Sequence, residues 1–198
     1  DCSIKCVSFS DCNGENQGTP IDISAGNIKA GHVCFSNCYA KNMIYASCFS
    51  FFASSATFLD HIAIFRCGDY SGTYPCTIAL NGNCVSLKST NSSFTASNSG
   101  NSIWSTIARD SFVIDFLVVY MTRSYTMFTH SDSDSTLIKA SKSLFLDDSP
   151  HGRIGYAINV VSGSATFTDS VFNRIMFGSF SSTSSFSLDN CFFSENQF

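Results

Sequence analysis

Charged residues are scarce in this 198-residue chain, where Asp, Glu, Lys and Arg together make up 13% of the sequence. The usual share is about twice as large. Disordered proteins combine high charge with few aromatics, whereas this chain contains 20 Phe residues, so disorder is excluded. Helix surfaces need Glu, Lys, Arg and Leu, and these are too few here. The frequent Ser, Thr, Phe, Val and Ile residues favour strands and turns instead.

Excess basic charge and long apolar runs are also missing. The net charge is −4 at pH 7, which offers no positive surface to nucleic acid or to an anionic membrane. A transmembrane helix needs a run of about 18 apolar residues. The longest candidate, Phe112 to Tyr120, is nine residues long and contains Asp115. We therefore expect no nucleic-acid partner and no direct membrane insertion by this segment.

The ten cysteines lack the arrangement of a metal site, because they form no paired CxxC knuckles and only four His accompany them. We therefore expect no metal and no cofactor. Two interpretations of the cysteines stay open: buried small hydrophobes stacked in a ladder, or disulfides of an oxidised surface protein. Cys12 and Cys38 each follow an aromatic by three residues, and Cys67 and Cys76 flank a loop that a disulfide could close. The connectivity cannot be deduced from the sequence.

A single glycosylation sequon is present at Asn91-Ser92-Ser93. It makes Asn91 a possible glycosylation site, just before one of the repeated aromatics described next.

One phrase recurs eight times along the chain: an alternating apolar run, a polar step, an aromatic and then small polar residues. The intervals between the aromatics are 21 to 30 residues. The central aromatics are Phe9, Phe35, Phe65, Phe94, Tyr120, Phe145, Phe172 and Phe193. A period between about 20 and 50 residues is typical of solenoid proteins.

The repeat predicts an all-β fold with three short strands in each unit, which is the geometry of a parallel β-helix. Leucine-rich and helical repeats are excluded because their sequence frames are absent, and a β-sandwich is the main competitor. We expect a solenoid of about eight coils over residues 1–198, as one segment of a longer repeat protein. In such a helix equivalent residues stack about 4.8 Å apart. The eight aromatics are therefore expected to form an inward core ladder.

Short motifs after the aromatics carry a family resemblance. Phe193-Ser194-Glu195-Asn196 matches a Phe-x-x-Asn motif, and Phe9–Cys12 and Phe35–Cys38 match it with Cys in the last place. Gly100–Ile103 and Gly155–Ile158 are degenerate relatives of a Gly-Gly-Ala-Ile motif. The chain thus resembles the polymorphic outer-membrane-protein type of β-helix surface protein, found in chlamydial autotransporter passengers and trichomonad surface proteins. The resemblance implies a single-stranded right-handed parallel β-helix, displayed outside the cell, with a role in adhesion.

One segment could support catalysis, since β-helices also build polysaccharide lyases and hydrolases. Asp147, Asp148, His151 and Arg153 place two carboxylates, an imidazole and a guanidinium within seven residues. Paired carboxylates could divide acid and base roles in glycoside cleavage, and the imidazole could move a proton. Pro and Gly punctuate the same segment, as in an ordinary β-helix loop.

We therefore predict a non-enzymatic extracellular or cell-surface protein that is structural or adhesive. Its loops would contact a protein or glycan partner on a host or other cell surface. A self-assembling fibre or scaffold, in which copies stack end to end, is the alternative. A polysaccharide lyase or hydrolase of the β-helix type is the second alternative.

Overall fold

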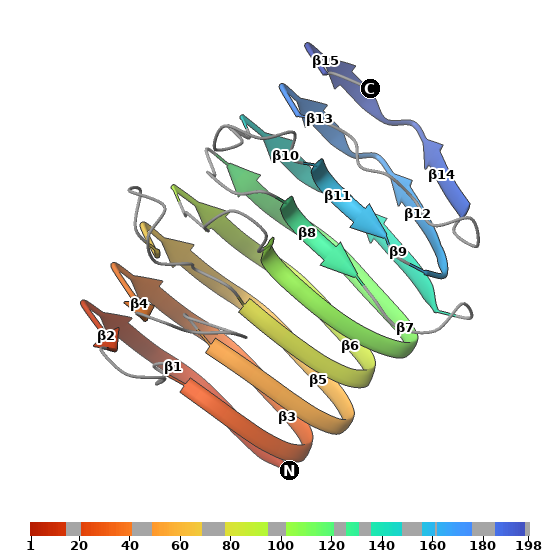
Figure 1. The fold of residues 1–198 in the computed structure, drawn as a ribbon. Helices are drawn as coiled ribbons and strands as arrows, with labels where there is room; N and C mark the ends of the chain where they lie inside the picture. Colours follow the sequence, from red (N-terminus) through yellow and green to blue (C-terminus); the bar gives the residue numbers. More distant parts are fainter. Residues whose placement is uncertain are drawn as a thin grey trace.

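The computed structural model describes residues 1–14, 21–40, 49–68, 78–94, 102–120, 126–130, 136–147, 156–160, 162–175 and 185–196. Throughout these ranges the regular elements are strands, and no helix occurs among them. Thirteen strands form one sheet in which all pairing is parallel, and it winds into a β-solenoid (Figure 1). The all-β parallel solenoid predicted from the repeat is confirmed.

A path of eight strands runs the length of the stack, with the two chain ends at opposite ends (Figure 1). In order it consists of β1 (Cys2–Ser10), β3 (Ile21–Ser36), β5 (Phe49–Phe65), β6 (Ile78–Ser93), β7 (Ser102–Tyr120), β10 (Leu144–Leu146), β13 (Val171–Asn173) and β15 (Phe192–Ser194). The strands beside this path are β8 (Thr126–His130), β9 (Leu137–Ser141), β11 (Tyr156–Val160), β12 (Ser164–Thr168) and β14 (Ser185–Asp189), while β2 (Asn13–Gly14) and β4 (Tyr39–Ala40) form a separate pair. We call each level of the stack a rung.

The number of turns differs from the expected eight. Four strands of 16 to 19 residues, β3, β5, β6 and β7, curve from one face of the solenoid to the next without a break, and the arrangement amounts to about four turns. Toward the C-terminus each level consists of separate short strands, such as β9 and β10. The eight repeats counted in the sequence therefore exceed the number of turns that are formed by continuous strands.

Sharp corners in the solenoid are made by single residues with positive φ. They come in pairs five positions apart and bracket a short strand segment, as at His32 and Asn37. The first corner uses Cys6, His32, His61, Ser89, Phe116, Lys142, Asp169 and Asn190. The second corner uses Asp11, Asn37, Arg66, Phe94, Asp147, Arg174 and Glu195. Their φ values lie between 48° and 64°, a region that costs energy for residues other than Gly.

Backbone hydrogen bonds between rungs help to hold these corners. The amide of Asn37 donates to the carbonyl of Phe65 at 3.1 Å, and that of Asp169 donates to the carbonyl of Asp189 at 3.1 Å. Side chains add a second link, since Asn37 Nδ2 donates to Asp11 Oδ1 at 3.2 Å. The hydrogen bonds between rungs therefore continue through each corner, and they offset part of the energy that the positive φ values cost.

The core fills the inside of the stack with alternating apolar side chains. Ile28, Trp104 and Phe112 are each 0% exposed, and outward neighbours such as Val113 point to solvent. Alternation at period two places one residue in the core and the next outside. Because every rung repeats this pattern, the core is one continuous column along the axis.

The expected aromatic ladder is present in two parts of the stack. Phe9 stacks on Phe35 with ring centroids 5.2 Å apart, and Phe172 lies between Phe145 at 5.2 Å and Phe193 at 5.1 Å. Phe35, Phe145 and Phe172 are each at most 1% exposed. These rings lie inside and contact along the axis.

In the middle of the stack the ladder prediction is wrong, because the aromatics there follow the inward position by one residue or, at Phe94, by two. The register partner of Phe35 is Ile64, not Phe65, and Phe65 is 37% exposed. Phe94 occupies a corner and Tyr120 pairs with outward Ser93. A shift of one residue moves a strand side chain to the other face. Phe65, Phe94 and Tyr120 therefore form their own edge-to-face row outside, with centroids 5.6 and 5.5 Å apart.

Candidate functional site

Three cysteines lie above one another, each directly after a second-corner residue. Their thiols donate across the corner to the carbonyl two residues back: Cys12 to Ser10 at 3.5 Å, Cys38 to Ser36 at 3.3 Å, and Cys67 to Phe65 at 3.6 Å. Buried hydroxyls do the same after the first corner, as in the 2.8 Å bond from Ser170 Oγ to the Thr168 carbonyl. These cysteines therefore satisfy corner carbonyls.

The disulfide predictions are not supported by this arrangement. All eight cysteines among the described residues are free thiols, including Cys12, Cys38 and Cys67, and Cys76 lies outside the described residues. The hydrogen bond with Cys67 and burial raise the pKa of the Cys38 thiol well above its ordinary value. Burial and the nearby Cys38 also raise the pKa of Cys12. A protonated thiol is a weak nucleophile, which suits a packing role.

The candidate catalytic segment is only partly described. Asp147 occupies a second corner with φ of 56°, and its Oδ1 forms an ion pair with Arg174 Nη2 from the equivalent corner of the next rung. Asp148, His151 and Arg153 lie outside the described residues. Arg174, the partner of Asp147, lies 27 positions later in the chain, which is one repeat interval. That interval is the sequence signal from which the pair could have been predicted.

The sequon residue Asn91 is exposed on the segment of β6 between the corners at Ser89 and Phe94. Its register partners there are Ala63 and Val118.

A surface hollow occurs where an outward column of side chains is interrupted. Lys5, Gly31 and Asp60 are register partners on three successive rungs, and all lie on the outer face. Gly31 contributes no side chain, so a hollow of about 290 Å³ opens between its two neighbours. The remaining lining residues are Lys29, Ala30, His32 and Phe58.

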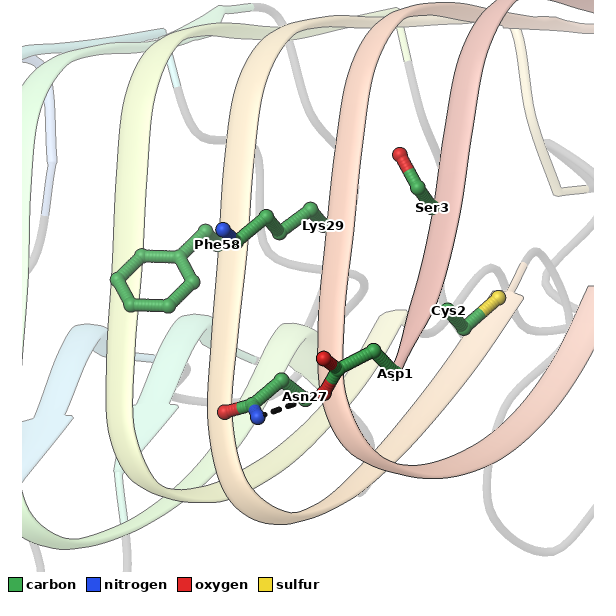
Figure 2. Close-up of a pocket in the computed structure, with 6 residues that line it drawn as sticks. All are labelled: Asp1, Cys2, Ser3, Asn27, Lys29 and Phe58. Carbon is green, nitrogen blue, oxygen red and sulfur yellow. Dashed lines mark hydrogen bonds between the residues drawn. The ribbon is translucent and has the colours of Figure 1, made fainter.

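A second hollow of about 490 Å³ shares Lys29 and Phe58 with the first one. Figure 2 shows it, with Lys29 reaching along the outer face toward the ring of Phe58 and with Asn27 donating to Asp1. Because the two hollows have these residues in common, we treat them together as the outer groove. The groove runs across the rungs of β1, β3 and β5.

The charges of the outer groove are unevenly paired. The carboxylate Oδ1 of Asp60 lies 2.8 Å from His61 Nδ1, and the His61 ring stacks on His32 with centroids 4.7 Å apart. Lys29 Nζ lies 6.0 Å from the centroid of the Phe58 ring. Within the part of the chain that the structure describes, neither Lys5 nor Lys29 has a carboxylate partner. Positive charge is therefore available in the groove.

The groove was missed in the sequence because it depends on contacts between rungs. The only available signal was Gly31 within an otherwise alternating strand, 26 residues after Lys5. Across the described residues, no group of three or more His, Cys, Asp or Glu side chains could hold a metal ion.

The described residues include no helix that is both long and apolar enough to cross a membrane. No family model, no curated protein and no solved structure matches this chain.

Proposed function

We propose that this chain is a non-enzymatic display module outside the cell, whose outer faces and loops contact a protein or glycan on a cell surface. The observation that carries the proposal is the continuous parallel pairing from β1 to β15, which arranges outward side chains in columns along one axis, with shifts of register only at bulges such as the one between Ala25 and Asn27. A solenoid of this kind presents extended binding surfaces on a stiff frame. The resemblance to surface adhesins of the polymorphic outer-membrane-protein type points the same way, and it also leads us to propose right-handed winding.

Two observations favour binding over catalysis. Asp147, the one described carboxylate of the candidate catalytic segment, is held in an ion pair with Arg174. The outer groove combines an exposed aromatic ring with ammonium groups that have no carboxylate partner among the described residues, which suits recognition of a ligand.

The test has two arms. Intact cells of the native source are treated with a cell-impermeant biotin reagent and, separately, with external protease. The proposal expects the chain to be labelled and cleaved without lysis. In the second arm, beads coated with the folded chain should adhere to cell surfaces more than beads coated with the heat-denatured chain. Labelling only after lysis, or equal adhesion of both bead types, would contradict the proposal.

Self-assembly remains the alternative, and exposed apolar side chains on the last described rung favour it. Phe192 is 61% exposed and Leu188 is 41% exposed, and within the described ranges β15 pairs with β13 alone. Negative-stain electron microscopy of the purified chain separates the two functions. Ordered polymers that form without a partner would favour a fibre or scaffold, whereas dispersed single particles would favour the adhesive module.

A further inference from the structure

We propose that the outer groove binds a carboxylate-bearing sugar unit of an acidic polysaccharide. The inference rests on the proposed function in that it names a ligand class for an extracellular binding module. It comes from four features of the groove: its size, its aromatic wall, its two lysines and its polar rim.

The size of the groove suits sugar units. Pockets for small organic ligands measure about 300–1,000 Å³, and the two adjoining hollows are about 290 and 490 Å³. They extend along the stacking axis, where successive rungs are about 4.8 Å apart. That spacing is comparable with the length of one sugar unit, so a short stretch of polysaccharide can follow the axis from rung to rung.

The aromatic wall offers a surface for a sugar ring. Phe58 lies on the outward face of β5 with 42% of its surface exposed. A pyranose has an apolar face made of C–H groups, and it gains dispersion contacts against a phenyl ring. The ring is supported from one side by the stem and ammonium of Lys29. The exposed ring of Phe58 beside the hollow thus offers a packing surface for a sugar.

The cations select for an acid. Lys5 and Lys29 lie on successive rungs and have no carboxylate partner among the described residues. A sugar carboxylate between them would accept charge-assisted hydrogen bonds, which are about twice as strong as neutral ones. Gly31 leaves the space in which that carboxylate can lie.

The polar rim argues against ligands of higher negative charge. Asp60 lines the same hollow, and its carboxylate repels a dianionic phosphate about twice as strongly as a singly charged sugar carboxylate at the same distance. The Asp60 carboxylate and the imidazole of His32 instead suit hydroxyl groups, which donate to the first and exchange hydrogen bonds with the second. A sugar acid fits this lining because its one carboxylate suits the lysines and its hydroxyl groups suit Asp60 and His32.

The test is a titration of the folded chain with galacturonic acid trisaccharide at low salt, followed by calorimetry or by saturation-transfer NMR. The fully methyl-esterified trisaccharide is the matched neutral ligand, and inorganic phosphate is the competing simple anion. We expect the acid to bind on the order of tenfold more tightly than the ester. We also expect raised salt to weaken the acid and to leave the ester unchanged.

Two variants probe the groove and one serves as control. Lys29→Gln removes a cation and should weaken binding on the order of tenfold. Gly31→Leu should abolish binding by filling the hollow. A Cβ at position 31 would meet its nearest neighbour, the Asp60 carbonyl oxygen, at 3.6 Å, so the backbone accommodates it. Lys139→Gln changes an exposed lysine in the same outward column, beyond the groove, and should bind like the unaltered chain.

Several results would overturn the inference: equal affinity for acid and ester, displacement of the trisaccharide by equimolar phosphate, unaltered binding by Lys29→Gln and Gly31→Leu, or no saturable binding in the millimolar range. Failure of the proposed function is a separate outcome. If beads carrying Gly31→Leu still adhere to cells, adhesion stands and the groove is not responsible. If the unaltered chain binds the trisaccharide but is labelled only after lysis, the groove stands and the surface location fails.

Discussion

Replacing an inward and an outward aromatic by alanine provides the sharpest check of the register. Phe172 is 0% exposed and stacks between Phe145 and Phe193, with centroids 5.2 and 5.1 Å away. Phe65 is 37% exposed, and its one aromatic neighbour among the described residues is Phe94, at 5.6 Å in an edge-to-face contact. The sequence repeat treats the two positions as equivalent, whereas the structure does not.

The expected losses of unfolding free energy differ several-fold. Phe172→Ala removes a fully buried ring and leaves a cavity, which costs about 3–5 kcal/mol. Phe65→Ala loses part of an exposed ring and a cation–π contact with Arg66, whose guanidinium lies 5.0 Å from the ring centroid, and should cost about 1 kcal/mol. A domain of ordinary stability has about 5–15 kcal/mol in total, so only Phe172→Ala should approach unfolding.

Urea unfolding measures both losses, and the single tryptophan, Trp104, is a suitable probe because it is fully buried. Fluorescence and far-ultraviolet circular dichroism give the midpoint and slope for each variant. Equal losses for the two variants, or a larger loss for Phe65→Ala, would show that Phe65 lies in the core and that the register of β5 described above is incorrect.

Three further predictions concern thiols, corners and buried hydroxyls. Because its pKa is raised in the fold, the Cys38 thiol contributes stability that is fully present below about pH 8.5 and is lost as pH rises. Urea unfolding from pH 8 to 10 should therefore show a fall in stability that Cys38→Ala reduces, and an identical fall in that variant would refute the assignment. Gly163→Ala should cost about 2 kcal/mol or more in thermal unfolding, since φ is +92° and the new Cβ would lie 2.5 Å from a carbonyl oxygen, while Gly26→Ala, with nothing within 4 Å, serves as the neutral control. Ser170→Ala should cost about 1–3 kcal/mol and speed amide exchange at Ser143, whose N–H donates to Ser170 Oγ at 3.1 Å, and unchanged exchange there would argue against that bond.

Much of the fold could be predicted because local chemistry agrees with the winding. Asp169, Asn190, Asp11 and Asn37 are polar residues that tolerate positive φ, and the sequence places them just where the chain turns. Apolar alternation between these positions marks the inward face. The parallel solenoid follows from these two signals together with the repeat.

The register could not be predicted where corner residues are atypical. Phe94 and Phe116 adopt positive φ although bulky residues rarely do so, and the neighbouring rungs hold them there. A search for the recurring aromatic therefore aligned Phe94 with core rings such as Phe35. The outer groove was invisible for a related reason, because a lysine and a glycine 26 residues apart become neighbours only after the rungs are stacked.

The paired corners restrict where the chain can change in length. Between the first and second corners the spacing is five positions wherever both are described, whereas the remaining arc ranges from 16 positions, between Arg174 and Asn190, to 24, between Asn37 and His61. An insertion between paired corners would turn inward side chains outward, whereas one in the long arc leaves the pairing intact if it falls between strands. Evolution or an engineer can therefore insert new segments into that arc, one rung at a time, while the segment between paired corners keeps the register from rung to rung.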